Sequence, residues 1–390
     1  MKKRIAILGS TGSVGRQALD VAAAHPERFE VVALAASQPS NAFLEQLRCW
    51  RPALAAVASG IPDRGMIADG LLVGEEALTR LAAACEADLV VVAVPGRVGL
   101  LPTLAALESG KTVALANKES LVMAGHLVMA AARARGVAVL PVDSEHNAIW
   151  QCLRGEGAPD APAAEVASLI LTASGGAFRD LPLAALSRVT PAEALRHPTW
   201  TMGPKITVDS ATLMNKGLEL IEASWLFGVP LERMQVVMHR ESIVHSLVEF
   251  VDGSLKAQLA VPDMRLPIQY ALSYPERWPC PVPRLDLARL GALRFGEVDR
   301  QRFRCMYVAL DAARAGGTYP AALSGADDEA VRLFLAGALP FDRIADVVEA
   351  VVQRHRPESD ASLAAVLAAD AWARATCREL VCQRAASGVA

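Results

Sequence analysis

Two acidic residues follow a short apolar run in the first half of the chain. The run Val139–Val142 precedes Asp143, Ser144 and Glu145. If this run is a strand that persists through Glu145, both carboxylates point to the same face. They would lie at the carboxyl end of a strand, where open α/β sheets place ligands. Carboxylates without clustered histidine or cysteine indicate Mg²⁺ or Mn²⁺ rather than zinc. The alternative is an Asp-Ser-Glu cap at the start of a helix.

A second polar cluster occupies a predicted helix further along the chain. Helical spacing places Asn215 and Glu219 on one face, which makes Glu219 a candidate third carboxylate. The alternative is an ordinary exposed glutamate. Gly217 in mid-helix costs about 1 kcal/mol relative to alanine, so we expect another group to approach closely there. We interpret His239 and His245, in strand-like segments, as structural histidines rather than ligands.

A Ser-Gly-Gly turn offers a candidate anion site. Ser174 and two glycines follow an apolar run, and the backbone amides of such a turn can bind an anion together with the serine hydroxyl. Ser210, Asn215 and Lys216 add donors and one positive charge that would suit a phosphate monoester. An ordinary turn is the alternative.

The segment 197–205 is predicted to be a loop, since it holds two prolines and a glycine. It also carries His197, Trp200 and Met202, bulky side chains that prefer burial. A lid that folds over a substrate would explain them. A loop packed permanently on the core is the alternative.

A glycine-rich loop at Gly9–Gly15 lies between a predicted strand and a predicted helix. Glycines allow a tight turn and close approach of a pyrophosphate, which the helix N-terminus would bind. The spacing is G-x-x-G-x-x-G, and a turn needed only for packing is the alternative. No acidic residue follows the second predicted strand, where an NAD site usually has one. The segment Ser37–Ser40 therefore favours NADP, although it offers no Arg or Lys to the 2′-phosphate.

Residues 1–150 are predicted to form an α/β domain with a Rossmann-like, doubly wound parallel sheet. Continuous apolar strands alternating with helices are typical of that fold. The predicted strands are Arg4–Leu8, Glu30–Ala35, Leu54–Val57, Leu89–Val94, Thr112–Leu115 and Val137–Val142. The predicted helices are Val14–Ala24, Ala42–Trp50, Glu75–Ala84 and Leu121–Arg135.

The pattern then changes to a central α+β domain over 151–275, with a largely antiparallel sheet. Its predicted strands are Val166–Thr172, Lys205–Val208, Gln235–His239, Ile243–Val251 and Ser254–Val261, and its helices are Pro191–Leu195 and Ala211–Phe227. Asp252-Gly253 is a hairpin signal. A proline-rich linker over 276–298 precedes a C-terminal helical bundle over 299–390, with segments near 300–315, 326–336, 341–354 and 359–384.

Composition argues against several classes of protein. The 390 residues carry a formal net charge of −3, so no strong field favours nucleic acid or an anionic membrane. The apolar run after the basic N-terminus is too short for a signal peptide, and no run is long enough to span a membrane. Seven scattered cysteines without a C-x-x-C pair are expected to be reduced and mostly buried. These features predict a cytoplasmic protein.

Together these motifs resemble the 1-deoxy-D-xylulose-5-phosphate reductoisomerase family. The matching stretches, in the order of the family, are GSTGSVG (9–15), LANKESLV (115–122), PVDSEHNAIWQ (141–151), TASGGAFRD (172–180), HPTWTMGPKITVDSATLMNKGLELIEA (197–223), HRESIVHSLVEFVDGS (239–254) and AVPDMRLPIQYAL (260–272). The resemblance implies an NADPH-binding domain, a catalytic domain with a mobile loop, a C-terminal helical domain and a homodimer. It implies conversion of the sugar phosphate deoxyxylulose phosphate into methylerythritol phosphate for isoprenoid precursor synthesis.

The resemblance also assigns roles by motif. The implied ligands of Mg²⁺ or Mn²⁺ are Asp143, Glu145 and Glu219. The implied substrate contacts are Lys118, Ser144, Glu145, Ser174, His197, Trp200, Met202, Ser210, Asn215, Lys216 and Glu219. The implied NADPH contacts are Thr11, Gly12, Ser13, Val14, Asn117, Glu119 and Gly203.

The chemistry implied by the family is a retro-aldol and re-aldol rearrangement followed by hydride transfer from NADPH. The metal would act as a Lewis acid throughout. Glu145 is the first candidate for proton transfer and Lys118 the second. A related NADP-linked reductase, or a non-catalytic NADP sensor, are the competing hypotheses.

Two segments depart from the family pattern. The segment Ser37–Pro39 lacks the basic or glycine residues often found there. The family commonly has L-N-A-A-N-E where this chain has Leu323–Asp328, a difference that we expect to concern packing or dimer support.

Overall fold

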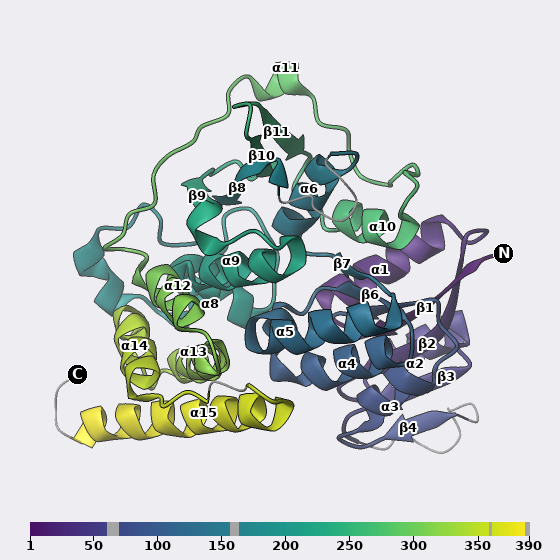
Figure 1. Ribbon diagram of the computed structural model, residues 1–390. Helices are drawn as coiled ribbons and strands as arrows, with labels where there is room; N and C mark the ends of the chain where they lie inside the picture. Colours follow the sequence, from purple (N-terminus) through teal and green to yellow (C-terminus); the bar gives the residue numbers. More distant parts are fainter. Residues whose placement is uncertain (61–69, 157–163, 359–360, 387–390) are drawn as a thin grey trace. The chain divides into compact units, whose positions relative to one another are not determined.

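The computed structural model describes residues 1–60, 70–156, 164–358 and 361–386 (Figure 1). The chain divides into two units. Unit 1 comprises Met1–Ser120, His126–Trp150 and Asp263–Arg284, and unit 2 comprises Leu121–Gly125, Gln151–Pro262 and Leu285–Ala390. This division differs from the predicted boundary at residue 275, because helix α10 (Arg265–Ser273) packs against α1 (Ser13–Ala24).

Unit 1 contains the predicted parallel sheet, with strand order β4-β3-β2-β1-β5-β6-β7. Its strands are β1 (Lys3–Leu8), β2 (Phe29–Ala36), β3 (Leu54–Val57), β4 (Leu71–Val73), β5 (Leu89–Val92), β6 (Thr112–Leu115) and β7 (Val139–Pro141). The pairings are all parallel, so the doubly wound fold is confirmed. The short edge strand β4 was not predicted. Three residues carry too little of a periodic pattern to mark a strand.

Helices connect most of the strands of unit 1 (Figure 1). Besides α1 and α10, these are α2 (Asn41–Trp50), α3 (Ala77–Ala84), η1 (Gly96–Gly99), α4 (Leu100–Glu108), α5 (Lys118–Arg135) and α6 (Ser144–Leu153). The sheet residues Ile5, Ile7 and Leu34 are fully buried and pack in one cluster with Ile268 of α10. Burial on both faces explains why these strands are apolar without alternation.

Unit 2 contains a second sheet with strand order β11-β10-β8-β9. The strands are β8 (Val166–Ala173), β9 (Met234–Met238), β10 (Val244–Phe250) and β11 (Leu255–Leu259). Strand β10 pairs antiparallel with β8 and β11, and β8 pairs parallel with β9. The predicted hairpin is present, and Gly253 adopts a φ of 84° in its turn. The largely antiparallel sheet is therefore confirmed.

The prediction of a strand at Lys205–Val208 is wrong, because these residues belong to helix α8 (Pro204–Thr212). The β-branched residues Ile206, Thr207 and Val208 suggested a strand. Gly203 at the N-cap and Pro204 in the first turn start a helix instead, since proline has the helical φ and lacks only a donor that the first turn does not use. The predicted helix Ala211–Phe227 is also divided, because Leu213 has a φ of 55° between α8 and α9 (Met214–Phe227).

The C-terminal part of unit 2 is helical, as predicted. Its helices are α12 (Arg304–Ala315), α13 (Tyr319–Leu335), η5 (Phe341–Arg343), α14 (Ile344–Arg354) and α15 (Leu363–Ala386), and residues 359–360 of the last predicted segment lie outside the described residues. The remaining elements of unit 2 are η3 (Leu183–Arg188), α7 (Pro191–Ala194), η4 (Leu231–Arg233) and α11 (Leu287–Leu290). Buried side chains of α12, α13, α14 and α15 share one core with those of α8 and α9.

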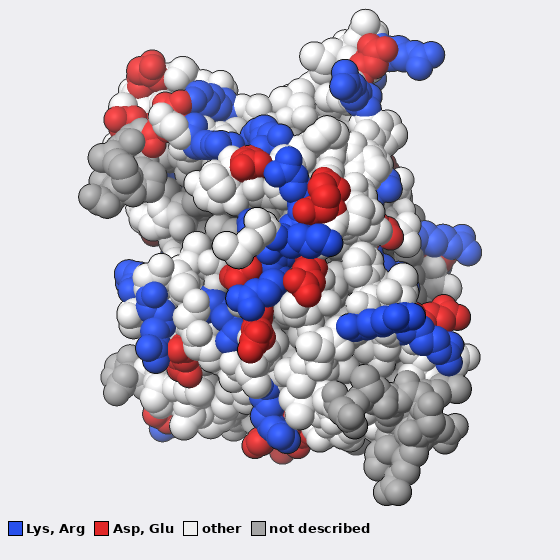
Figure 2. Space-filling model, turned by 90° about the vertical axis from the view of Figure 1, so that its right-hand side faces the viewer, with Lys and Arg blue, Asp and Glu red and all other residues white. Residues whose placement is uncertain are grey.

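The surface and the cysteines agree with the composition. On the face drawn in Figure 2, basic side chains lie among acidic ones. All seven cysteines have free thiols, as expected. In the described part of the chain, no helix is both long and apolar enough to cross a bilayer.

Candidate active site

The glycine-rich loop forms the predicted turn between β1 and α1. Gly9 has a φ of 85°, and a Cβ on Gly15 would lie 2.2 Å from the carbonyl oxygen of Gly9. Glycine is therefore required at both positions. Gly12 is the N-cap of α1 and provides no side-chain cap. The first amides of α1 are thus left for an anion, which the helix dipole also favours.

Asn117 and Glu119 connect α5 to the loop that follows β5. The Asn117 amide nitrogen donates to the carbonyl oxygens of Val94 and Gly96, at 2.9 and 2.8 Å, and to Glu119 Oε2 at 2.8 Å. Its oxygen accepts from the Ser120 amide and caps α5. Both side chains are buried, so they fix the backbone of the loop at the carboxyl end of the sheet.

Asp143 follows β7 and is paired with Lys118 at the start of α5. The distance from Lys118 Nζ to Asp143 Oδ2 is 2.7 Å, and both side chains are largely buried. Burial opposes ionisation of Asp143, but Lys118 and a contact with His146 outweigh it and hold the pKa of this carboxyl far below its ordinary value. The Asp143 carboxylate therefore carries a negative charge before any ligand binds.

The predicted geometry of Glu145 is wrong in one respect. Strand β7 ends at Pro141, and Glu145 lies in the first turn of α6, so it does not share a strand face with Asp143. The Asp143 carboxylate accepts a hydrogen bond from the amide of the next residue, Ser144, at 3.0 Å. The Ser144 hydroxyl donates to Glu145 Oε2 at 2.6 Å.

His146 was missed in the sequence. It is fully buried, and its Nδ1 lies 3.5 Å from Asp143 Oδ2, one helical turn apart. Its place directly after Glu145 was the available signal, because a helix that starts at Ser144 brings residues 143 and 146 together.

In unit 2, three predicted residues meet at one point. The His197 Nε2 atom lies 3.0 Å from the Ser174 Oγ and 3.1 Å from the Ser210 Oγ. The amides of Thr199 and Trp200 donate to His197 Nδ1, so the neutral ring carries its proton on Nε2, between the two hydroxyls. The three groups together form a cluster of uncharged donors.

The neutral state of His197 has two causes. Burial first, and then the positive charge of Arg179, lower the pKa of His197 to about 4. Arg179 was not selected in the sequence analysis. Its Nη1 donates to the Ser174 carbonyl oxygen at 2.8 Å and so supports the Ser-Gly-Gly turn. An arginine within the quoted TASGGAFRD stretch was the available signal.

Asn215, Lys216 and Glu219 lie in the first turns of α9. The Asn215 amide donates to Glu219 Oε1 and the Lys216 ammonium to Glu219 Oε2, both at 2.5 Å. Glu219 is only 1% exposed, so its interpretation as an ordinary surface glutamate is wrong. The close approach expected at Gly217 is confirmed: a Cβ there would lie 2.5 Å from the Cβ of Ala309 on α12.

The segment 197–203 has no regular secondary structure before α8 begins. Trp200 and Met202 are half-buried, and the Trp200 ring lies 6.2 Å from that of His245. His239 is a structural histidine, as expected: its Nδ1 contacts the Arg294 carbonyl oxygen at 2.8 Å and its Nε2 accepts two backbone amides.

The described residues suit a divalent cation and a dinucleotide. Asp143, Glu145 and Glu219 are hard oxygen donors, and lysines adjoin Asp143 and Glu219. The turn at Gly9 and Gly15 has the space that a pyrophosphate requires, since any Cβ would fill it.

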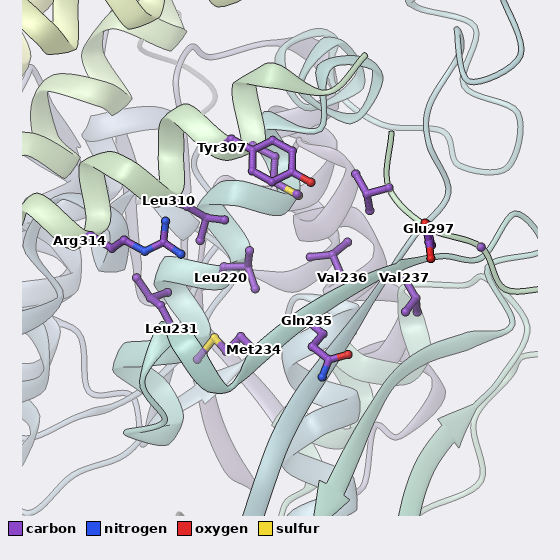
Figure 3. Close-up of a pocket in the computed structure, with 13 residues that line it drawn as sticks. Leu220, Leu231, Met234, Gln235, Val236, Val237, Glu297, Tyr307, Leu310 and Arg314 are labelled. Carbon is purple, nitrogen blue, oxygen red and sulfur yellow. The ribbon is translucent and has the colours of Figure 1, made fainter. Parts of the chain in front are cut away.

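A separate cavity of unit 2, of about 380 Å³, contains none of the predicted site residues (Figure 3). Side chains of Leu220, Met234 and Tyr307 line it. This cavity is therefore a feature separate from the predicted site residues.

Three family models match consecutive parts of the chain. Two described as 1-deoxy-D-xylulose 5-phosphate reductoisomerase and its C-terminal domain match residues 5–125 and 139–227. A third, described as DXP reductoisomerase C-terminal domain, matches residues 259–376.

Whole-chain relatives agree with these matches. The 1-deoxy-D-xylulose 5-phosphate reductoisomerase of Thermomicrobium roseum is 54% identical, over 98% of this chain and 98% of the relative. That of Geobacillus kaustophilus is 52% identical, over 97% and 100%.

Solved structures are similar as well. The Zymomonas mobilis reductoisomerase in complex with NADPH has a TM-score of 0.89 at 39% identity, covering 98% of this chain and 99% of that one. A DOX-P reductoisomerase in complex with NADPH, fosmidomycin and magnesium has a TM-score of 0.91 at 39% identity, covering 97% and 98%.

Proposed function

Because the chain belongs to the 1-deoxy-D-xylulose 5-phosphate reductoisomerase family, we infer that it converts 1-deoxy-D-xylulose 5-phosphate into 2-C-methyl-D-erythritol 4-phosphate with NADPH and a divalent metal ion. The observation that carries this inference is 54% identity to a relative of that name over 98% of both chains. The product is a precursor of isoprenoids in the non-mevalonate pathway.

We propose that Asp143, Glu145 and Glu219 bind Mg²⁺ or Mn²⁺. Lys118 keeps Asp143 ionised, and ionised carboxylates are the ligands that these cations prefer. Glu219 is buried and oriented by Asn215 and Lys216, which restricts the direction of its oxygens. When bound, the metal supplies Lewis-acid polarisation of the substrate's oxygens, and NADPH supplies the hydride.

The substrate phosphate is assigned to Ser174, His197, Ser210, Asn215 and Lys216. The first three form the cluster of uncharged donors, so a dianion would meet hydroxyl and imidazole protons without a competing carboxylate among them. Lys216 adds a positive charge from α9. Holding the phosphate keeps both fragments of a cleaved carbon skeleton in place until they recombine.

The other substrate contacts are assigned to Lys118, Ser144, Trp200 and Met202. Lys118 and Ser144 are buried polar groups around the ionised Asp143, so they suit the hydroxyl and carbonyl end of the substrate. Trp200 and Met202 supply apolar cover from the loop over 197–205, which we propose to be a lid over substrate and nicotinamide.

The cofactor contacts are assigned to Thr11, Gly12, Ser13 and Val14 at the start of α1, and to Asn117, Glu119 and Gly203. The uncapped amides of α1 support a pyrophosphate there. Because Asn117 and Glu119 bind each other and the backbone, their contribution is to shape the loop rather than to supply free side-chain donors.

Proton transfer is assigned first to Glu145 and second to Lys118. Glu145 is half-buried and accepts a hydrogen bond from the Ser144 hydroxyl, which orients its carboxylate for general acid–base work. Lys118 is the cation that already donates to Asp143 and is placed to donate to a developing oxyanion.

A homodimer and a cytoplasmic location complete the proposal. Both follow from the family to which the chain belongs. Sedimentation of the purified protein would test the dimer.

The decisive experiment follows NADPH consumption at 340 nm with deoxyxylulose phosphate, with and without Mn²⁺. We expect oxidation that needs both substrate and metal, and a methylerythritol phosphate product. If the protein binds NADPH but no oxidation occurs with this substrate, the inference fails and a related sugar-phosphate reductase becomes the better assignment.

A further inference from the structure

A buried cluster of charged side chains adjoins the proposed phosphate site, and the reaction does not use it. Lys205 lies in the first turn of α8, and its ammonium donates to Asp209 Oδ2, one turn along the same helix. It also donates to Asp327 Oδ2 of α13, at 2.8 Å, and lies 3.8 Å from Asp328 Oδ1. One lysine therefore links the start of α8 to α13.

The two aspartates that bind Lys205 are buried carboxyls whose charged forms are disfavoured. Asp209 is 2% exposed and Asp327 is fully buried. Their Oδ1 atoms have no hydrogen-bond partner among the described residues. Burial and the nearby Asp327 raise the pKa of Asp209 well above its ordinary value, and burial also raises that of Asp327. Both shifts disfavour two negative charges on this buried pair, and Lys205 supplies the cation that both carboxyls contact.

The third carboxylate has its own cation. Asp328 accepts from Arg374 of α15 at 2.6 Å, and the same guanidinium binds Asp370. Helices α13 and α15 pack tightly, since a Cβ on Gly325 would lie 2.5 Å from the Asp370 carbonyl oxygen. The packing of α13 against α15 therefore gives Lys205 a rigid partner in Asp327 of α13.

Lys205 holds the helix that carries Ser210. Asp209 directly precedes Ser210 in α8, and the Ser210 hydroxyl contacts His197 at 3.1 Å. A helical turn is stiff, so a shift of Asp209 by an ångström moves Ser210 by a similar amount. The start of α8 is also the end of the segment 197–203, so the same link fixes one end of the proposed lid.

We propose that Lys205 is a positioning residue for the phosphate site: by binding Asp209 and Asp327 it fixes α8, and with it the Ser210 hydroxyl, against α13. The proposal rests on the proposed function, because it takes Ser210 as a phosphate donor. Lys205 itself does not contact the substrate.

The test compares Lys205→Met with the double variant Lys205→Met/Asp327→Asn. Lys205→Met leaves two buried carboxyls without their cation. We expect the KM for deoxyxylulose phosphate and the inhibition constant of inorganic phosphate to rise together by about tenfold or more, with a smaller change in kcat. The double variant removes one carboxyl and should recover part of both losses. Arg314→Met, which removes an exposed cation of α12 paired with Asp311, is the matched control and should change neither constant.

Two further variants make the result decisive. If Lys205→Met does not fold, Lys205→Arg and the double variant must both raise the two constants. Folded variants with unchanged KM and phosphate inhibition overturn the proposal, whatever their thermal stability, because a purely structural role lowers stability alone.

Ser210→Ala distinguishes failure of the positioning role from failure of the phosphate assignment. If it raises KM while the Lys205 variants do not, only the positioning role is wrong. If Ser210→Ala has no effect either, the phosphate assignment is wrong and the positioning role with it.

Discussion

The proposed site residues around Asp143 in unit 1 suit a cation, whereas those around His197 in unit 2 suit an anion. In unit 1, Lys118 and His146 hold Asp143 in its ionised form despite burial, which leaves a carboxylate for a cation. In unit 2, burial and Arg179 keep His197 neutral between two serine hydroxyls, which leaves uncharged donors for an anion. Each unit therefore sets the charge state of its own groups before any ligand binds.

Under the proposed assignments, this difference separates recognition of the metal-chelating end of the substrate from recognition of its phosphate end. A metal-chelating end needs fixed negative charge, and a phosphate end needs protons from neutral or positive groups. Both groups are buried and both have a cationic neighbour. Lys118 stabilises the charged form of Asp143 in unit 1, whereas Arg179 disfavours the charged form of His197 in unit 2. The comparison predicts that substitutions around Asp143 affect chemistry and that substitutions around His197 affect binding.

The largest effect is expected for Glu145→Gln. Loss of a metal ligand and proton-transfer group removes several kcal/mol of transition-state stabilisation. The kcat should therefore fall on the order of 10²–10⁴-fold at saturating Mn²⁺. Steady-state kinetics with a metal-binding assay checks this, with Glu108→Gln on the surface of α4 as the control. Near-normal turnover with metal bound would show that the assignment of Glu145 is wrong.

Ser210→Ala should act on binding. A hydrogen bond to a charged group contributes about 1.5–3 kcal/mol, so we expect KM for deoxyxylulose phosphate to rise roughly 10- to 100-fold. The kcat at saturation should change much less. Thr201→Ala, in the exposed part of the neighbouring loop, is the control. A large fall in kcat with unchanged KM would break the comparison between the two units.

A smaller effect is expected for stability at acidic pH. The pKa of His197 is about 4 in the folded protein and near 6.5 when unfolded, so the unfolded state binds more protons between these values. Stability must therefore fall as pH falls from 6.5 to 4. After allowance for the partial exposure of the ring, the contribution of His197 is about 1–2 kcal/mol.

Denaturant unfolding of wild type and His197→Asn at pH 7 and pH 5 checks this contribution. Asparagine cannot gain the proton, so the variant should lose less stability between the two pH values. Equal losses in both proteins would mean that His197 is not kept neutral by the fold.

The smallest effect is expected for Ser37→Ala, at the exposed tip after β2. Because the segment Ser37–Ser40 itself carries no basic residue, a single hydroxyl should change the NADPH-over-NADH preference by less than about tenfold. Titration of both cofactors by fluorescence measures this ratio. A loss of preference greater than a hundredfold would place the main 2′-phosphate contact at Ser37 and extend the comparison to the cofactor.

Local patterns predicted most of the fold and proposed candidate site residues. The parallel sheet, the glycine-rich turn and the hairpin at Gly253 were predictable because each depends on neighbouring residues: apolar runs, a left-handed φ and turn chemistry. The predicted strand at Lys205–Val208 failed for the same reason, since its β-branched residues suggest a strand locally. The buried bond from Lys205 to Asp327, 122 residues away, helps to hold the helix that Gly203 and Pro204 start.

What the sequence determined by itself was the set of chemical groups and their order: acids after an apolar run, hydroxyls in a Ser-Gly-Gly turn and helix, and a glycine-rich loop. Their charge states were decided only by tertiary structure. Lys118 keeps Asp143 ionised, burial keeps His197 neutral, and burial together with Asp327 raises the pKa of Asp209, all through contacts between segments distant in the chain. Electrostatic energies depend on distance and on exclusion of water, and neither follows from spacing along a chain.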